Sequence, residues 1–213
     1  SALLVLSTAL NVIAVRYLQL DQTVSIMFST PFLIALIAGP LLGEWIGLRR
    51  WLAISVGFLG VVVVMRPGVG GIHPAAILSV AGTICYAFYN VSTRVLARSD
   101  STETTLFYSN VVGFLGTTAI LPTVWQTPQS LTIAIVMVAI GAFGAFGHFL
   151  LIAAHRLAPA PVLAPYIYTQ IVWMVMLGYF VFADVPSRWT LIGASVVIAS
   201  GLYLLLFERR SRT

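Results

Sequence analysis

Charge is what this 213-residue sequence has least of: only 8% of its residues are charged, and lysine does not occur. Soluble domains carry about 25% charged residues. Eleven arginines and six acidic residues cannot keep a chain that is 60% hydrophobic dispersed in water. The same surplus of apolar residues excludes an intrinsically disordered chain. Composition therefore predicts an integral membrane protein.

Cysteine and enzyme motifs are also scarce. Cys85 is the one cysteine, which excludes a disulfide within the chain. The sequence has no His-Glu-x-x-His zinc motif, no Walker A phosphate loop and no Gly-x-Ser-x-Gly nucleophile turn. We therefore expect no enzymatic activity, no metal and no cofactor. The net charge of +5 is not gathered on an amphipathic face, so nucleic-acid binding is not expected either.

Long uncharged runs fill most of the sequence. A helix needs about 20 apolar residues to cross the hydrocarbon core of a bilayer. The runs between charged residues provide for eight such helices, which predicts an all-α membrane protein. The expected spans are 2–18, 22–43, 51–67, 74–96, 104–123, 131–155, 160–183 and 188–207.

The arginines predict how these spans are oriented. Eight crossings put both chain ends on the same side of the membrane. Cytoplasmic loops are enriched in arginine and lysine, and the side that holds both ends collects most of the arginines. We therefore expect both ends to be cytoplasmic. The arginines on that side are Arg49, Arg50, Arg94, Arg98, Arg156, Arg209, Arg210 and Arg212.

A weak internal repeat appears when the sequence is shifted by 140 residues: Ser29 falls on Thr169, and Gly43-Glu44 falls on Ala183-Asp184. Corresponding spans are five crossings apart, an odd number, so the two units must be inverted relative to each other in the membrane. Inverted repeats are typical of secondary transporters. Spans 74–96 and 104–123 have no counterpart, so we expect two helices to precede this chain in a longer protein. The corresponding spans are 2–18 with 131–155, 22–43 with 160–183, and 51–67 with 188–207.

Particular residues strengthen this interpretation. The first unit contains Ser29-Thr-Pro-Phe-Leu-Ile-Ala-Leu, Gly43-Glu44 before a basic loop, and Gly57-Phe-Leu-Gly60, and the second contains Ala164-Pro-Tyr-Ile-Tyr-Thr-Gln170. This pattern resembles the EamA domain of the drug/metabolite transporter superfamily, except that Asp184 stands where glutamate is usual. The resemblance implies a ten-helix bundle of two inverted five-helix repeats in the bacterial inner membrane. Residues 1–67 would be the last three helices of the first repeat, residues 74–207 the second repeat, and residues 208–213 a cytoplasmic tail.

The function that follows is secondary transport. We expect a carrier that moves a small metabolite or drug by alternating access, as an exporter. The alternatives are an uptake carrier for a substrate such as S-adenosylmethionine, a non-transporting membrane scaffold or truncated product, and, third, a membrane enzyme. The expected partners are a small-molecule substrate and the lipid bilayer. Coupling to protons or to an exchanged substrate stays open, as does the oligomeric state.

Polar residues inside the expected spans are the candidates for a substrate cavity, because burying them without partners costs free energy. Amide and hydroxyl groups that share a helix face with aromatic rings are typical of small-molecule pockets. The alternative is that these groups form hydrogen bonds between helices. The candidate cavity residues are Asn11, Tyr86, Asn90, His148, Tyr166, Gln170 and Trp173.

Two further features bear on the mechanism. Pro31 and the cluster Pro159, Pro161 and Pro165 are expected to interrupt spans 22–43 and 160–183, and helices broken at matching places indicate a transporter site. Glu44 and Asp184 lie at span ends, where we expect them to pair with arginine or to cap a loop. His148 is then the candidate for proton coupling, since its side chain titrates near neutral pH.

Overall fold

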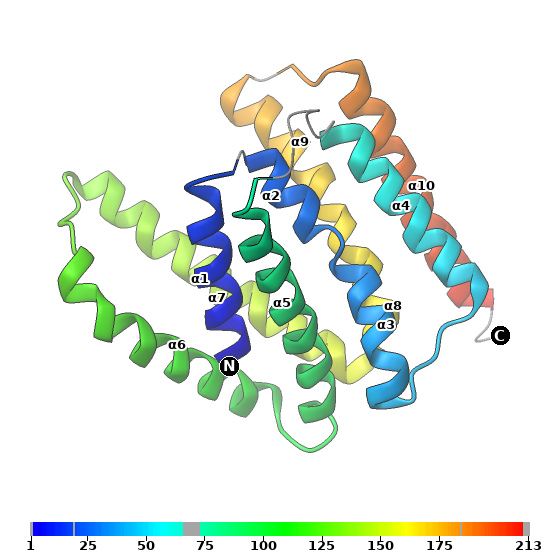
Figure 1. Ribbon diagram of the computed structural model, residues 1–213, viewed down its shortest axis with the longest axis horizontal. Coiled ribbons are helices and arrows are strands. Elements are labelled where there is room, and N and C mark those ends of the chain that lie inside the picture. The colour runs from blue at the N-terminus through cyan, green and yellow to red at the C-terminus, as the bar shows by residue number, and fades with distance from the viewer. Residues whose placement is uncertain (1, 19, 66–72, 184, 211–213) are drawn as a thin grey trace.

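The structure is a computed structural model that describes residues 2–18, 20–65, 73–183 and 185–210. Over these residues the chain forms helices and no strand (Figure 1). The all-helical prediction is therefore confirmed for the described part of the chain. The elements are α1 (Ala2–Val15), α2 (Leu20–Met27), α3 (Thr30–Leu42), α4 (Leu48–Met65), α5 (Ala76–Leu96), α6 (Thr102–Val124), α7 (Leu131–Leu157), α8 (Ala160–Leu163), η1 (Ala164–Tyr168), α9 (Thr169–Phe182) and α10 (Arg188–Arg210).

Helices occupy each of the expected spans, but two of the spans are discontinuous. Four helical segments are long and apolar enough to cross a membrane by themselves. Span 22–43 is divided into α2 and α3, and span 160–183 into α8, the 3₁₀ helix η1 and α9. The end of span 51–67, Arg66 and Pro67, lies outside the described residues. The four segments are Ala76–Leu96, Thr102–Thr123, Leu131–Leu157 and Ala160–Val181.

The break between α2 and α3 follows from Pro31. Proline has no N–H, so the carbonyl of Met27, four residues earlier, cannot receive its usual helical hydrogen bond. The Thr30 hydroxyl donates to that carbonyl oxygen at 2.5 Å, and the Ser29 hydroxyl donates to the Ile26 carbonyl oxygen at 2.6 Å. The Thr30 hydroxyl thus supplies a donor in place of the N–H that Pro31 lacks, and the Ser29 hydroxyl adds to the hydrogen bond that the Ile26 carbonyl oxygen receives from the Ser29 backbone N–H.

The second break repeats this arrangement. The Thr169 hydroxyl, at the start of α9, donates to the Tyr166 carbonyl oxygen at 2.7 Å. Ser29 and Thr169 are 140 residues apart, and so are the acceptors Ile26 and Tyr166. The expectation that both spans are interrupted near their prolines is confirmed.

The ends of α3 and α9 also correspond. Gly43 follows α3 with φ 70°, and Ala183 follows α9 with φ 56°, so both lie in the left-handed region. They are the two described residues with positive φ, and they too are 140 positions apart. Glycine adopts this conformation freely, whereas alanine does so at a cost.

This difference predicts opposite effects for two substitutions. Gly43→Ala should lower the free energy of unfolding by about 1 kcal/mol, and Ala183→Gly should raise it by about 1 kcal/mol. No atom lies within 4 Å of a Cβ built on Gly43, so the effect there is conformational and not a clash. Melting temperatures in one detergent measure both changes. A lowered melting temperature for Ala183→Gly would contradict the assignment.

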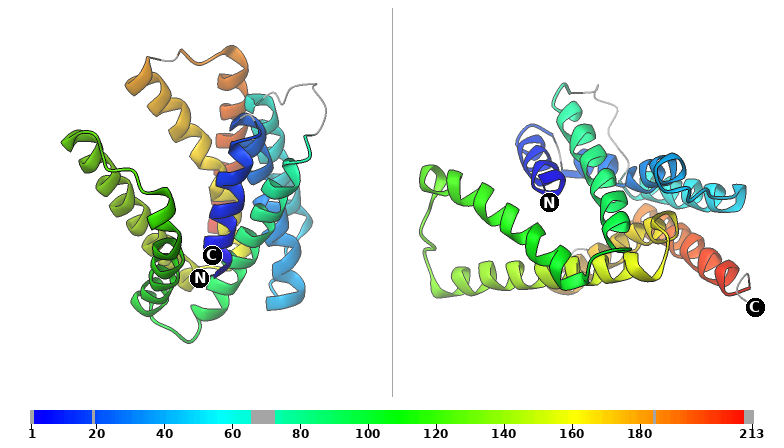
Figure 2. Two further views of the ribbon diagram at one scale, coloured as in Figure 1. Left: turned by 60° about the vertical axis from the view of Figure 1, so that its left-hand side comes forward. Right: turned by 90° about the horizontal axis from the view of Figure 1, so that it is seen from below.

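Helix packing brings both breaks to the centre of the molecule. α4 packs along α10, α1 packs along α5, and α3 packs against α5 and α8. Phe28, at the first break, and Tyr168, at the second, belong to one buried cluster. Figures 1 and 2 show α6 and α7 as an arm that diverges from α9 and α10. The rest of that cluster is Val61, Ile171 and Val197.

Candidate functional site

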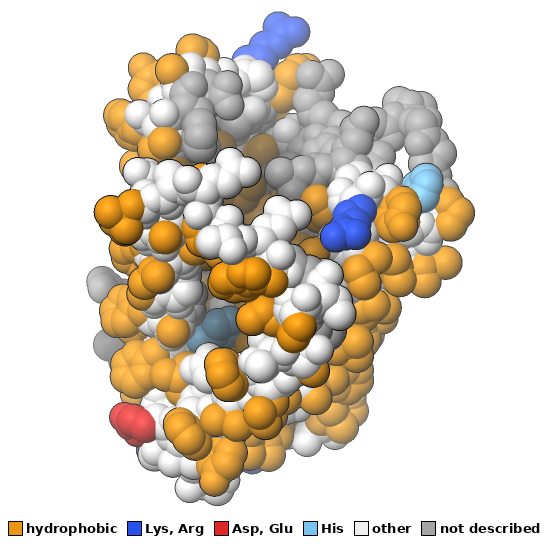
Figure 3. Space-filling model, turned by 90° about the vertical axis from the view of Figure 1, so that its left-hand side faces the viewer, with side chains coloured by type: hydrophobic (Ala, Val, Ile, Leu, Met, Phe, Trp, Pro, Cys, Tyr) orange, Lys and Arg blue, Asp and Glu red, His pale blue; other side chains and the backbone are white. Residues whose placement is uncertain are grey.

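A cavity of about 850 Å³ lies between the two breaks and the helices α1, α5 and α7. Its wall takes residues from both sides of each break, so the discontinuous segments help to shape it. Figure 3 shows the face formed by the diverging arm, with a hollow in which a histidine side chain is visible. Six of the seven predicted cavity residues line this space: Asn11, Tyr86, His148, Tyr166, Gln170 and Trp173.

The wall of the cavity combines aromatic and aliphatic side chains with hydroxyl and amide groups. The described residues that line it include no arginine, aspartate or glutamate. Tyr166 and Trp173 are exposed, and the amide of Gln170 has no hydrogen-bond partner among the described residues. An amide offers donors and an acceptor, and aromatic faces attract planar rings and cations. The cavity therefore suits a molecule that carries a planar ring and has no net negative charge.

Asn11 both lines the cavity and contacts α5, against which α1 packs. Its Oδ1 accepts a hydrogen bond from the Ser79 hydroxyl of α5 at 3.1 Å, and its Nδ2 donates to the Ser7 carbonyl oxygen at 2.9 Å. A Cβ on Gly82 would collide with the Asn11 amide. The amide is thus held against α5 by specific contacts, and it reaches the cavity with a fixed orientation.

Asn90, the seventh predicted residue, does not line the cavity. It is 2% exposed, its Nδ2 donates to the Tyr86 carbonyl oxygen at 2.8 Å, and its Oδ1 lies 3.3 Å from Nε2 of His155 on α7. In this structure Asn90 therefore joins two helices, which is the alternative role considered from the sequence.

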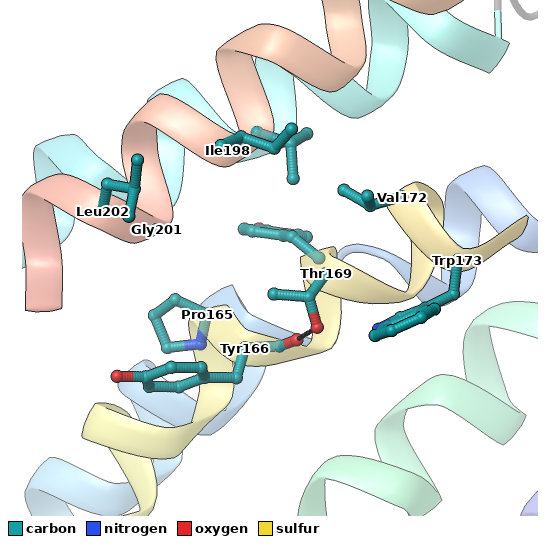
Figure 4. A pocket seen from close by; sticks show the side chains of 10 residues that line it. Pro165, Tyr166, Thr169, Val172, Trp173, Ile198, Gly201 and Leu202 are labelled. Atoms are coloured by element: carbon teal, nitrogen blue, oxygen red, sulfur yellow. Dashed lines mark hydrogen bonds between the residues drawn. The ribbon is translucent and has the colours of Figure 1, made fainter. Parts of the chain in front are cut away.

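A smaller apolar crevice of about 230 Å³ adjoins the cavity between η1, α9 and α10. Tyr166, Thr169 and Trp173 line both spaces. Figure 4 shows these three side chains along η1 and α9, with Ile198 and Leu202 of α10 on the opposite wall. The second break thus lies between the larger cavity and the apolar crevice.

Glu44 holds one end of the bundle together. Its side chain is 11% exposed and accepts hydrogen bonds from Arg94 Nε at 2.8 Å and from the Ala160 backbone N–H at 2.9 Å. Arg98 lies 3.5 Å away. Arg94 also donates to the carbonyl oxygen of His155. Glu44 therefore joins the ends of α3 and α5 to the start of α8, and Arg94 connects them to the end of α7. We call these four residues, Glu44, Arg94, His155 and Ala160, the junction.

The expected pairing of Glu44 with arginine is confirmed, whereas Asp184 lies outside the described residues. The sequence did not identify Ala160 and His155 as members of the junction. Their contribution is a backbone N–H and a backbone carbonyl, which every residue possesses, so no residue type signals it. The described residues contain no group of three or more His, Cys, Asp or Glu side chains that could hold a metal ion.

Comparison with known proteins decides the family. The sequence profile of the EamA-like transporter family matches residues 73–207. The chain belongs to this family. The resemblance to the drug/metabolite transporter superfamily is thereby confirmed, and this EamA chain is a multi-pass protein of the inner membrane.

Named relatives of this EamA chain are transporters. The S-adenosylmethionine uptake transporter of Rickettsia conorii is 30% identical over 186 residues, which cover 87% of this chain and 63% of the relative. The riboflavin transporter of Vibrio cholerae is 23% identical over 189 residues, covering 89% of this chain and 63% of the relative. The EamA chain thus spans less than two thirds of the length of these relatives.

A protein of known crystal structure has the same fold. It superposes with a TM-score of 0.82 at 18% identity, over 97% of this chain and 74% of that protein. At this identity the likeness concerns the fold alone.

Proposed function

We propose that this EamA chain belongs to a secondary carrier that binds a metabolite with a planar ring and no net negative charge in the 850 Å³ cavity and moves it by alternating access. The observation that carries the proposal is the composition of the cavity wall: aromatic rings from both breaks and the amides of Asn11 and Gln170, without a charged side chain other than histidine among the described residues. A phosphorylated substrate would need arginine or a similar cationic group there. Arg94 of the junction and the nearby Arg98 are not part of the wall.

The proposed architecture is eight membrane spans, which form part of a ten-helix bundle of two inverted five-helix repeats. Residues 1–67 would end the first repeat, residues 74–207 would form the second, and residues 208–213 would be a tail. Three features recur 140 residues apart and support the repeat: the break, its capping hydroxyl, and the left-handed residue that ends the helix. Broken helices at matching places of two repeats are where secondary transporters bind substrate.

For the orientation we propose that both chain ends are cytoplasmic, because that side collects most of the arginines. A reporter fused in the α5–α6 loop after Ser99 should then report the cytoplasm, and one fused in the α6–α7 loop after Gln126 should report the opposite side. The reverse pattern would contradict the orientation and leave the fold unaffected.

For the direction we propose uptake in place of the export expected from the family resemblance. The support is that four relatives from Rickettsia species are named S-adenosylmethionine uptake transporters. S-adenosylmethionine and riboflavin both carry a planar heteroaromatic ring, which matches the aromatic wall. S-adenosylmethionine also carries a sulfonium cation, which aromatic faces attract.

Counterflow in liposomes tests the carrier function. Liposomes that contain the purified protein and unlabelled S-adenosylmethionine should take up labelled S-adenosylmethionine faster than protein-free liposomes, and a parallel set is loaded with riboflavin. A nucleoside monophosphate should not exchange, because the cavity wall offers its phosphate no cation. Absence of exchange with both ring compounds would favour a non-transporting scaffold. Uptake and efflux rates in cells would separate import from export.

Gln170 and Asn90 should respond differently to replacement by leucine. Gln170→Leu removes a cavity amide and should weaken substrate binding about 2- to 13-fold, the equivalent of one hydrogen bond of about 0.5–1.5 kcal/mol. Asn90→Leu instead leaves the buried His155 ring unpaired and should lower the free energy of unfolding by about 1–3 kcal/mol. Substrate affinity and melting temperature are measured for both variants. A normal affinity for Gln170→Leu would remove this residue from the proposed site.

A further inference from the structure

The apolar crevice between η1, α9 and α10 shares part of its wall with the cavity of the proposed carrier. Tyr166, Thr169 and Trp173 line both spaces, so a ligand that lies against these side chains contacts both. The cavity wall includes the amides of Asn11 and Gln170, whereas the described residues of the crevice wall include no amide and no charged group. Apart from the Tyr168 ring, the rest of the crevice wall is formed by aliphatic residues and glycine: Pro165, Val172, Val197, Ile198, Gly201 and Leu202.

The crevice is large enough for a substituted benzene ring. Its volume is about 230 Å³, and an apolar protein cavity of about 150 Å³ binds benzene. An amide or hydroxyl group buried there without a partner would cost free energy. The Thr169 hydroxyl at its edge already donates to the Tyr166 carbonyl oxygen at 2.7 Å. The crevice therefore favours the apolar part of a ligand, and the cavity favours the part that forms hydrogen bonds.

In the first unit two aromatic rings fill the corresponding space. Phe32 of α3 and Phe58 of α4 contact each other edge to face, with 5.3 Å between ring centroids. The positions 140 residues later are Val172 of α9 and Ile198 of α10, and both line the crevice. Figure 4 shows these two side chains on facing walls. The crevice thus lies where the second unit has aliphatic side chains in place of a ring pair.

Gly201 of α10 enlarges this space. Its counterpart Val61 in α4 is buried at 0% exposure, whereas no atom lies within 4 Å of a Cβ built on Gly201. Two other lining residues are larger than their counterparts: Val197, and Trp173 at the boundary with the cavity. The second unit therefore has an aromatic side chain at the boundary and open space beside Gly201.

We propose that the crevice binds the apolar end of the substrate's ring system, so that the carrier selects a fused ring with a methyl-substituted benzene edge and a hydrogen-bonding heterocyclic edge. The inference rests on the proposed carrier function. The benzene edge lies between α9 and α10, where it takes the place that Phe32 and Phe58 fill in the first unit. The heterocyclic edge lies in the cavity, whose wall provides the amides of Asn11 and Gln170. An adenine ring has nitrogen atoms in both of its rings and no edge of the first kind.

Three ligands test this selection on the purified protein. Riboflavin has a benzene ring with two methyl groups, an analogue of riboflavin lacks both methyl groups, and S-adenosylmethionine lacks the benzene ring. Each methyl group buried in an apolar site is worth about fourfold in affinity, so the analogue should bind about 15-fold more weakly than riboflavin. Equilibrium dialysis measures the three affinities.

Gly201→Leu is the decisive variant, because it adds a side chain to the crevice wall and changes no residue of the cavity wall. Riboflavin should bind at least about 15-fold more weakly, and the ratio between riboflavin and its analogue should fall to about onefold, since neither ring can enter the crevice. The affinity for S-adenosylmethionine should stay within about twofold.

Gly178→Leu is the matched control. Gly178 lies on α9, no atom lies within 4 Å of a Cβ built on it, and it lines neither the crevice nor the cavity. The ratio of about 15 between the two flavins should persist in this variant. If Gly201→Leu does not fold, Val172→Phe combined with Ile198→Phe replaces it. This double variant puts the ring pair of the first unit into the crevice and should also lower the ratio to about onefold.

The outcomes separate the inference from the carrier function. If none of the three ligands binds the unchanged protein, the carrier function and the inference are both contradicted. Binding of S-adenosylmethionine without riboflavin overturns the inference and leaves the carrier function intact. Equal binding of riboflavin and its analogue to the unchanged protein also overturns it, and would mean that a lipid chain or another helix covers the crevice. A ratio that persists in Gly201→Leu, or that is lost in Gly178→Leu as well, contradicts the assignment to this crevice.

Discussion

Gly193→Val is expected to separate α10 from α4 and to prevent stable folding of the purified protein. A Cβ at Gly193 would lie 2.5 Å from the Gly60 carbonyl oxygen, 2.5 Å from Val64 Cγ2 and 2.9 Å from the Val64 backbone nitrogen. Two of these three atoms belong to the backbone of α4, so they cannot move aside as a flexible side chain can. The two helices must therefore move apart.

Moving α10 away from α4 would disrupt contacts along the whole interface between these two helices. Val61 of α4 and Val197 of α10 are buried there at 0% and 3% exposure, and the Ser200 hydroxyl donates to the Ala53 carbonyl oxygen at 2.7 Å. Overpacking in a core costs about 1–3 kcal/mol, and a clash with backbone lies at the upper end, about 3 kcal/mol or more. Monodisperse yield in detergent and the melting temperature measure the loss.

Gly201→Val provides the control for this prediction. It places the same side chain on the same helix, and no atom lies within 4 Å of a Cβ built there. Its melting temperature should stay close to that of the unchanged protein. If Gly193→Val and Gly201→Val had the same melting temperature, the inferred close approach of Gly193 to α4 would be contradicted.

Sequence patterns predicted the discontinuous spans because their causes are local. Pro31 removes one backbone donor wherever it occurs in a helix, which favours an interruption near residue 30. Pro40 in α3 and Pro122 in α6 nevertheless lie inside continuous helices, so a proline alone does not decide where a helix is divided. The 140-residue shift likewise paired Ser29 with Thr169 and Gly43 with Ala183. The shared hydrogen bonds and left-handed conformations of these pairs appear only in the structure.

The partners of polar side chains could not be predicted in the same way. Tyr86 and Asn90 are four residues apart on one face of α5, so the sequence assigned them a common environment. Tyr86 lines the cavity, however, whereas Asn90, one helical turn further along the same face, contacts His155 of α7. Helical periodicity gives the direction of a side chain and not what lies opposite it. That depends on contacts between residues far apart in sequence, as between Glu44 and Ala160.

The last prediction fills the cavity from α7. Gly147 lines the cavity, and no atom lies within 4 Å of a Cβ built on it, so Gly147→Trp places an indole ring in open space without a clash near the backbone. An aromatic ring of this size covers roughly 150–250 Å² of surface. It would therefore occupy the aromatic wall against which we propose that the substrate ring lies. Substrate affinity should fall by more than about tenfold, or about 1.4 kcal/mol.

Gly141→Trp decides whether this loss is specific. Gly141 lies on the same helix, also has no atom within 4 Å of a built Cβ, and is not part of the cavity wall. Six residues correspond to about 120° around the helix, so its side chain leaves α7 in another direction. Both variants should keep a similar melting temperature, because each adds one exposed ring to α7. Binding of labelled S-adenosylmethionine and riboflavin to the two purified variants is the measurement. Equal affinities would mean that substrate binds elsewhere than against the wall that Gly147 shares with Tyr166 and Trp173.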